Sequence, residues 1–315
     1  MATIQEQLPS QKPKTTKAAD DQQKGSGTRF EAVIETLIRI SGISAVVIMA
    51  LIFMFLLREG LPAFIDNPVS NLLGWRWYPI EDKYGLLPLL VGSLLVTLGA
   101  IVIAVPLGLT TAVYLGEFAP KWLREILKPL IEVLAGIPSI VLGFLGWVAL
   151  APLIQRMGAP TGLTAFTGSI ILAYMALPTI VSITEDALYA VPQEYRDGAL
   201  AIGATQWQTI WRVVLPAARS GIVIAIMLGI GRAIGETMAV MMVTGNAANI
   251  PDFGAGMLFE PVRTMTATIA AEMGEVANGS LHYNTLFGIG ITLFVITFTI
   301  NTLTTWFIGG SGRNR

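Results

Sequence analysis

Residues 86–116 read LLPLLVGSLLVTLGAIVIAVPLGLTTAVYLG, a run of 31 residues without a charged side chain. An α-helix rises about 1.5 Å per residue, so about 20 apolar residues are needed to cross the hydrocarbon core of a bilayer. The run is long enough to do so. It therefore predicts a transmembrane helix.

Five further stretches are also largely free of charge, and together with the first they predict six spans. The chain of 315 residues is 53% hydrophobic and only 13% charged, whereas a soluble domain carries about 25% charged residues. We therefore predict an all-α, polytopic membrane protein. The five stretches are Ile40–Leu57, Val133–Gln155, Thr167–Thr184, Ser220–Gly245 and Leu286–Ile308.

The placement of lysine and arginine predicts that both termini are cytoplasmic. Six spans put the two termini on the same side of the membrane. That side holds 14 basic residues in the predicted tails and loops, and the opposite side holds 5. Positive residues stay in the cytoplasm during insertion, so the richer side is the inner one.

The remaining segments give the chain its organisation. The N-terminal residues are polar and lack the apolar core of a signal peptide, so we predict a disordered tail. The second external loop contains a stretch, residues 263–276, that favours a short helix. The predicted regions are a cytoplasmic tail at 1–28, a first transmembrane helix at 37–57, an external loop at 58–85, a core at 86–308 with a cytoplasmic loop at 190–217 and an external loop at 246–283, and a cytoplasmic tail at 309–315.

Composition also excludes several classes of function. The net charge of −1 argues against a partner nucleic acid, which requires a basic excess. There is no cysteine, and His282 is the single histidine, so we predict no catalytic set and no metal site. The chain has no glycine-rich loop ending in Lys-Ser or Lys-Thr, so it is not expected to bind ATP itself.

The cytoplasmic loop carries the most informative pattern. Residues 194–203 read EYRDGALAIG and, after nine further residues, 213–216 read VVLP. A short helix from about Pro192 to Gly203 is expected, because proline favours the start and glycine the end of a helix. Such a helix can lie against a soluble partner and transmit its movement to the spans at both ends of the loop.

This pattern resembles the signature loop of binding-protein-dependent ABC importer permeases: Glu-Ala-Ala, three residues, Gly, nine residues, Ile-x-Leu-Pro. Asp197 and Gly198 replace the first two signature residues, and Val213 replaces the isoleucine. The resemblance implies a type I ABC importer permease in a bacterial or archaeal cytoplasmic membrane. The residues expected to couple it to an ATPase are Glu194, Asp197, Gly198, Ala199, Gly203, Val213, Leu215 and Pro216.

A narrower resemblance extends over roughly residues 40–308. Residues 231–240 read GRAIGETMAV, and residues 266–270 and 294–298 read TATIA and FVITF; these stretches look like the PstC type of phosphate importer permease. The resemblance implies transport of inorganic phosphate. It also implies a PstA-like permease subunit, two PstB-like ATPase subunits that bind ATP and Mg²⁺, and a PstS-like phosphate-binding protein.

Arg232 lies in the middle of the fifth predicted span. An arginine at the bilayer centre costs about 2.5–3.5 kcal/mol on insertion scales, so it should face the bundle interior and have a partner. Glu236, one turn away, is the expected partner. We predict that Arg232, Glu236 and Thr237 line the substrate pathway; the alternative is a buried ion pair that fixes helix packing.

Prolines occur within two predicted spans. Pro138 and Pro178 lie in similar sequences, GIPSIV and ALPTIV, 40 residues apart. A proline removes a backbone hydrogen bond and bends a helix. The pattern predicts two bent helices around a central pathway, with ordinary kinked packing as the alternative.

Three other functions compete with phosphate import. A permease for another oxyanion, such as molybdate or sulfate, would share the signature loop but not the segment around Arg232. An ion-coupled secondary transporter would need no ATPase. A structural anchor would leave a charged residue in the middle of a span without a role.

Overall fold

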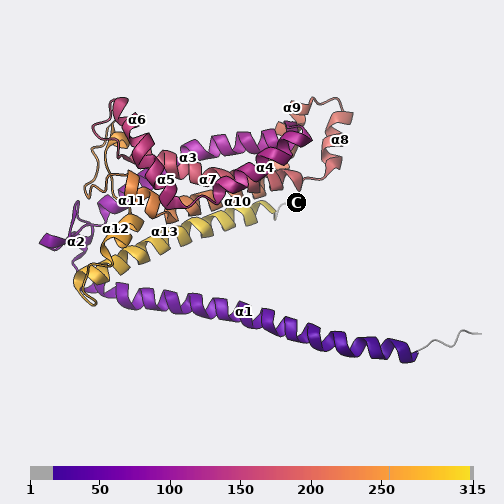
Figure 1. Ribbon diagram of the computed structural model, residues 1–315, viewed down its shortest axis with the longest axis horizontal. Coiled ribbons are helices and arrows are strands. Elements are labelled where there is room, and N and C mark those ends of the chain that lie inside the picture. The colour runs from indigo at the N-terminus through magenta and orange to yellow at the C-terminus, as the bar shows by residue number, and fades with distance from the viewer. Residues whose placement is uncertain (1–16, 255, 313–315) are drawn as a thin grey trace, which may run out of the picture. The chain divides into compact units, whose positions relative to one another are not determined.

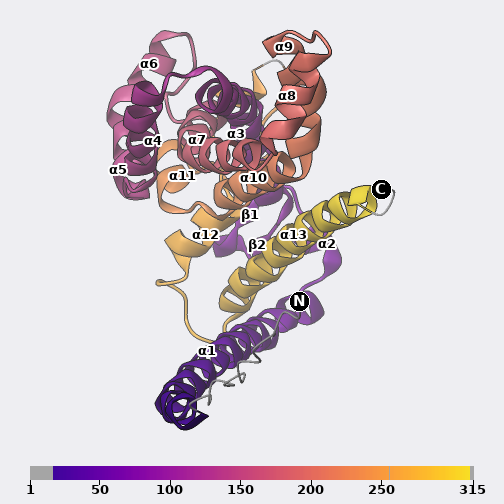
Figure 2. The same cartoon turned by 90° about the vertical axis from the view of Figure 1, so that its right-hand side faces the viewer.

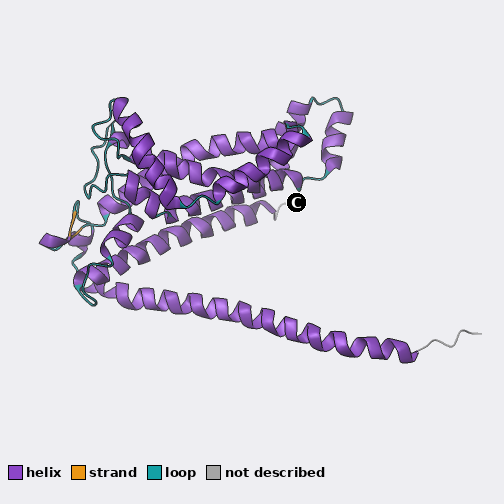
Figure 3. Ribbon diagram, in the orientation of Figure 1, coloured by secondary structure: helices purple, strands orange, loops and turns teal. Residues whose placement is uncertain are grey.

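A computed structural model describes residues 17–254 and 256–312. The chain divides into two compact units, residues 1–55 and 56–315. Most of helix α1, Lys17–Asp66, belongs to the first unit, and the later elements belong to the second. Figure 3 shows that regular structure is almost entirely helical, as predicted.

Six helices of the described chain are long and apolar enough to cross a membrane, which confirms the predicted number of spans. The fourth is the most deeply packed, with 61% of its most apolar window buried, while the first has none buried within this chain. The six are Glu31–Asp66, Leu87–Phe118, Ser139–Arg156, Ala165–Tyr189, Gln206–Gly235 and Leu281–Trp306.

Several spans are built from successive helical segments. A π turn, with its wider i→i+5 bonding, closes the second span and interrupts the third and fifth. Up to the third span the elements are α2 Val69–Leu72, β1 Trp77–Tyr78, η1 Pro79–Glu81, β2 Lys83–Tyr84, α3 Leu87–Val113, η2 Tyr114–Phe118, α4 Lys121–Ala135, α5 Ser139–Leu145, η3 Gly146–Leu150 and α6 Ala151–Arg156. They continue with α7 Ala165–Tyr189, α8 Gln193–Ala201, α9 Gln206–Thr209, η4 Ile210–Val214, α10 Leu215–Gly235, α11 Met238–Val243, η5 Met257–Phe259, α12 Met265–Glu272 and α13 Leu281–Gly312.

Helix α7 lies between α3 and α10 at the centre of the second unit (Figure 2). Ile180 of α7 is buried and fits against a glycine on each neighbour. A Cβ added at Gly108 of α3 or at Gly229 of α10 would come within 2.7 Å of its side chain. Because these positions lack a side chain, the three helices approach closely and bury the core between them.

The two ends of the second unit differ in character. One end carries α8, α9 and the C-terminal end of α13 (Figure 1). The other carries α2, α12 and a two-stranded antiparallel ribbon in which Trp77 pairs with Tyr84 and Tyr78 with Lys83. By the predicted orientation, the first end is cytoplasmic and the second is external.

Helix α1 is longer at both ends than predicted. It begins at Lys17, so residues 17–28, predicted to be disordered, are helical; residues 1–16 of the predicted tail lie outside the described residues. At the other end α1 enters the predicted external loop and ends at Asp66. Gly60 packs directly against Phe287 of α13, and this contact sustains the helix beyond Arg58.

The third span begins later than predicted. Residues 133–135 belong to α4, a separate helix, and the span itself starts at Ser139. Gly136 ends α4, and Pro138 precedes the first residue of α5. The residue before a proline disfavours the helical conformation, so the chain changes direction between the two helices.

Candidate functional site

The predicted coupling helix is present, and local sequence fixes both of its ends. Pro192 precedes α8, and Gly203 follows it with a φ of +88°, a conformation that glycine adopts without steric cost. The Gly203 N–H donates to the carbonyl of Leu200 at 3.0 Å. The next N–H, of Ala204, donates to Ala199 at 3.1 Å. These two bonds form the Schellman motif that ends a helix.

A second helix begins soon after the first. Thr205 and Gln208 form a capping box at the start of α9, which continues through η4 into α10. The fifth-span helix thus starts at Gln206, inside the predicted cytoplasmic loop 190–217, and not at the predicted Ser220. The π turn precedes Pro216, whose missing N–H cannot close an α-helical bond to the fourth residue before it.

Most of the predicted coupling residues are accessible at the cytoplasmic end. Large apolar side chains accompany them, and Ile202 is 87% exposed. Such exposed apolar surface is typical of a protein interface. Glu194, Asp197, Gly198, Gly203 and Pro216 are exposed, Val213 and Leu215 are half-buried, and Ala199 is buried. The exposed apolar neighbours, which sequence reasoning missed, are Tyr195, Leu200, Ile202, Trp207 and Trp211.

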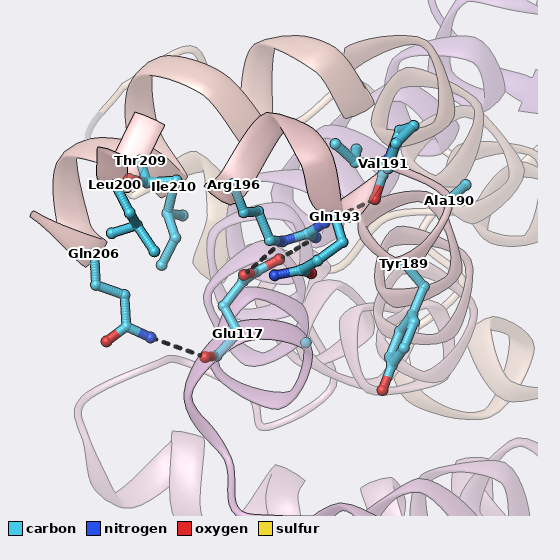
Figure 4. A pocket seen from close by; sticks show the side chains of 12 residues that line it. Glu117, Tyr189, Ala190, Val191, Gln193, Arg196, Leu200, Gln206, Thr209 and Ile210 are labelled. Atoms are coloured by element: carbon cyan, nitrogen blue, oxygen red, sulfur yellow. Dashed lines mark hydrogen bonds and ion pairs between the residues drawn. The ribbon is translucent and has the colours of Figure 1, made fainter. Parts of the chain in front are cut away.

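One largely buried ion pair attaches α8 to the second span. Arg196 Nη2 lies 2.7 Å from Glu117 Oε1, and Arg196 Nε donates to Glu117 Oε2 at 3.3 Å (Figure 4). The pair borders a cytoplasmic cavity of about 650 Å³. Sequence reasoning assigned no function to either residue. A charge placed directly at the end of a long apolar run could have pointed to Glu117, but no comparable local pattern marks Arg196.

A second buried carboxylate fixes α4 against α7. Glu185 is 1% exposed, and its oxygens lie 3.8 Å from Arg124 Nε and 3.3 Å from Lys128 Nζ. Lys128 also pairs with the exposed Asp186 at 3.2 Å. Arg124 donates in addition to the carbonyls of Leu115 and Gly116. These contacts are consistent with a structural role for Glu185.

The predicted fifth span, Ser220–Gly245, is broken close to its charged residues. Helix α10 ends at Gly235, Glu236 is extended with a ψ of 135°, and α11 starts at Met238. Glu236 Oε1 accepts the N–H of Ala239 at 3.1 Å, so the carboxylate caps α11. The Thr237 hydroxyl donates to the Gly235 carbonyl at 3.4 Å.

The expected pairing of Arg232 with Glu236 is wrong. Among the described residues Arg232 has no ion pair, because the helix ends between the two residues and does not hold them one turn apart. Arg232 is exposed within this chain. It borders a groove of about 690 Å³ between α10 and α13 that also contains Asn301, Thr304 and Thr305.

The two prolines have different positions. Pro138 stands between α4 and α5, so it separates two helices and does not bend a single span. Pro178 is buried inside α7, which runs without interruption from Ala165 to Tyr189. The structure therefore corrects the prediction for Pro138, and the predicted bend at Pro178 stays a prediction.

The external end has a polar cluster centred on Glu272 of α12. Its carboxylate lies 2.9 Å from Arg263 Nη2 and 2.8 Å from His282 Nε2. The indole of Trp77 donates to both oxygens at 3.1 Å. Burial raises the pKa of the nearby Tyr84 phenol, and the charge of Asp82 adds to the effect. The cluster ties α12, the β-ribbon and α13 together.

The six spans and the coupling helix define a membrane permease, and comparison with known proteins gives its family. The family described as "Binding-protein-dependent transport system inner membrane component" matches residues 104–312. This match includes more than half of the chain, with the coupling loop and the broken fifth span. The chain belongs to this family, whose members are multi-pass transport subunits of ABC importers. Such permeases work with an ATPase and a substrate-binding protein.

Individual relatives are similar over most of their length. The chain is 36% identical over 320 residues to the phosphate transport system permease protein PstC of Mesorhizobium japonicum, covering 95% of both chains. It is 42% identical over 253 residues to the probable ABC transporter permease protein YqgH of Bacillus subtilis, covering 78% of this chain and 81% of that one.

Solved structures show the same fold at low sequence identity. A chain of a bacterial ABC transporter that imports the acidic polysaccharide alginate superposes with a TM-score of 0.62 at 14% identity, over 91% of this chain and 100% of the other. A chain of the MetNI methionine ABC transporter, in an inward-facing conformation, gives a TM-score of 0.56 at 19% identity, over 72% and 98%. The predicted type I importer fold is confirmed.

Proposed function

We propose that this chain carries inorganic phosphate across the cytoplasmic membrane as one of two permease subunits. The observation that carries the proposal is the 36% identity with a phosphate permease over 95% of both chains. The groove between α10 and α13 supports the proposal. Arg232, which has no ion-pair partner among the described residues, borders this groove.

The partners follow from the same relationship. We propose a PstA-like second permease subunit, two PstB-like ATPase subunits and a PstS-like phosphate-binding protein. ATP and Mg²⁺ bind in the ATPase subunits. The exposed side chains of α8 and the residues around it, Ile202 and Trp207 among them, form the surface that contacts an ATPase.

Arg232 provides the positive charge that attracts the anion. Its planar guanidinium can donate to two phosphate oxygens at once. Because Arg232 has no carboxylate bound to it among the described residues, those donors are available. Glu236 limits the net positive charge near the break, and its carboxylate can accept a hydrogen bond from the P–O–H group of monohydrogen phosphate. The hydroxyl of Thr237 adds a polar group to the same segment.

Transport proceeds by alternating access. ATP binding closes the two ATPase subunits and draws the coupling helices of the two permeases together. The pathway then opens outward and receives phosphate from the docked binding protein. Hydrolysis returns it to the inward-open state.

The test is ATP-dependent uptake of labelled phosphate by vesicles that contain the complete complex. Arg232→Ala should reduce uptake by about tenfold or more, the usual effect of losing a charged hydrogen bond. Arg232→Lys should restore it only in part, because an ammonium lacks the planar fork. Arg156→Ala, an exposed arginine at the end of α6, is the control. Uptake unaffected in both Arg232 variants would remove the residue from the pathway, and preferential uptake of molybdate or sulfate would refute phosphate.

A further inference from the structure

Arg196 lies on the inner side of the coupling helix, where it does not face the ATPase surface. Its side chain is 14% exposed, and that of Glu117 is 10% exposed. Nε and Nη2 of Arg196 each donate a hydrogen bond to a different oxygen of the Glu117 carboxylate. The neighbours Glu194 and Asp197 are exposed. Figure 4 shows the Arg196 side chain pointing toward Glu117.

The same guanidinium also holds the end of the fourth span. Arg196 Nη1 donates to the carbonyl of Val191 at 2.7 Å, and Nη2 donates to Leu188 at 2.9 Å. These carbonyls lie at and just beyond the C-terminal end of α7, and the Leu188 carbonyl also accepts the Val191 N–H at 3.2 Å. One arginine therefore binds two backbone carbonyls and the Glu117 carboxylate at once.

Glu117 makes a third connection. Its backbone carbonyl accepts the Gln206 side-chain N–H at 3.3 Å, and Gln206 is the first residue of the helix that leads into the fifth span. Glu117 itself lies in η2, at the end of the second span. The second, fourth and fifth spans and α8 thus meet at a single pair of residues.

Other polar attachments of α8 are missing in the described chain. The side-chain hydrogen bonds that leave α8 for another element all come from Arg196. The remaining one, from Gln193 to Asp197, stays within the helix. Within the described residues, the Glu117–Arg196 pair is therefore the direct polar connection from α8 to the second span.

We infer that Glu117 and Arg196 are positioning residues that couple ATP hydrolysis to transport, by making the second span follow the coupling helix. This inference rests on the proposed ATP-driven import but not on phosphate being the cargo. Neutralising the pair leaves the ATPase surface of α8 in place. Hydrolysis then continues while the helices of the pathway no longer move with it.

The test uses the complete complex in vesicles and measures ATP hydrolysis and phosphate uptake on the same sample. The principal variant is the double change Glu117→Gln with Arg196→Gln, because it leaves no unpaired buried charge and so avoids the usual folding defect of a single change. Uptake per ATP hydrolysed should fall about tenfold, within the range of coupling between contacting residues. Glu125→Gln, an exposed glutamate on α4, is the matched control and should leave the ratio unchanged.

Two results would overturn the inference. One is a wild-type ratio of uptake to hydrolysis in the double variant. The other is loss of the ATPase subunits from the purified double variant, which would place the pair in the docking surface itself. A second measurement does not depend on the cargo: added binding protein should alter hydrolysis in the wild type but not in the double variant. If binding protein alters ATP hydrolysis in wild-type vesicles and these vesicles import no phosphate, the proposed substrate is wrong. The coupling role is then still decided by comparing this effect on hydrolysis between the wild type and the double variant.

Discussion

Replacing Glu185 by glutamine measures how strongly a buried carboxylate holds the cytoplasmic end of the bundle. Glu185 is 1% exposed and forms ion pairs with two basic residues of α4 at 3.3 and 3.8 Å. The change keeps the shape of the side chain and removes its charge. Helix α4 then loses its ion pairs with the buried carboxylate of α7, and two cations remain beside a neutral amide.

The expected loss of folding free energy follows from these distances. At an effective dielectric constant of about 20, unit charges at such separations attract by about 5 and about 4 kcal/mol. Desolvation offsets much of this gross attraction, but removal of one partner from a buried pair costs about 3–5 kcal/mol. Burial lowers the pKa of Lys128, but the hydrogen bond to Asp186 and the charge of Glu185 outweigh it and raise the pKa above the ordinary 10.5. Lys128 therefore remains charged at neutral pH.

The assay is thermal unfolding of the purified permease in detergent at neutral pH. A loss of this size should lower Tm by about 10 °C. The control is Asp186→Asn, which removes the other carboxylate from the same lysine. Asp186 is 67% exposed and lies 3.2 Å from Lys128, and an exposed pair contributes only about 0–1 kcal/mol. Equal shifts in the two variants would refute the reasoning, because distance alone and not burial would then set the cost.

Two glycine substitutions give further predictions. Gly203→Val should fray α8 and reduce co-purification of the ATPase, because a φ of +88° costs a branched residue about 1–3 kcal/mol. Gly203→Asn should be tolerated better. Equal recovery of the ATPase with both variants would contradict this prediction. Gly92→Ala should lower Tm by several degrees, because its Cβ would meet the backbone oxygen of Arg263 at 2.3 Å and overpacking costs about 1–3 kcal/mol. Gly274→Ala, which has open space, should leave Tm unchanged, and a similar loss at both glycines would show that the close approach is unimportant.

Features determined by neighbouring residues were predictable from the sequence. The six spans depend on apolar runs, which any helix in a membrane requires. The two ends of α8 depend on Pro192 and Gly203, whose effects act within one helical turn. For this reason the coupling helix could be placed correctly.

Features determined by tertiary contacts were not predictable in the same way. Glu117 and Arg196 are 79 residues apart, and Trp77 is 195 residues from Glu272, so no local pattern joins them. The break at Glu236 was hidden inside an apolar run that reads as one helix. Once the helix ends at Gly235, the spacing rule that pairs residues four apart no longer applies.

Ile180 occupies a position that limits how the permease can deform. Its side chain fits between glycines of two neighbouring helices, so sliding any of the three past another would drive a methyl group into a backbone. Tightly packed interiors have few alternative arrangements and resist gradual shear. Close to Ile180 the second, fourth and fifth spans are therefore held in fixed register, whereas their cytoplasmic ends lie beyond this contact and depend on the Glu117–Arg196 pair to move together.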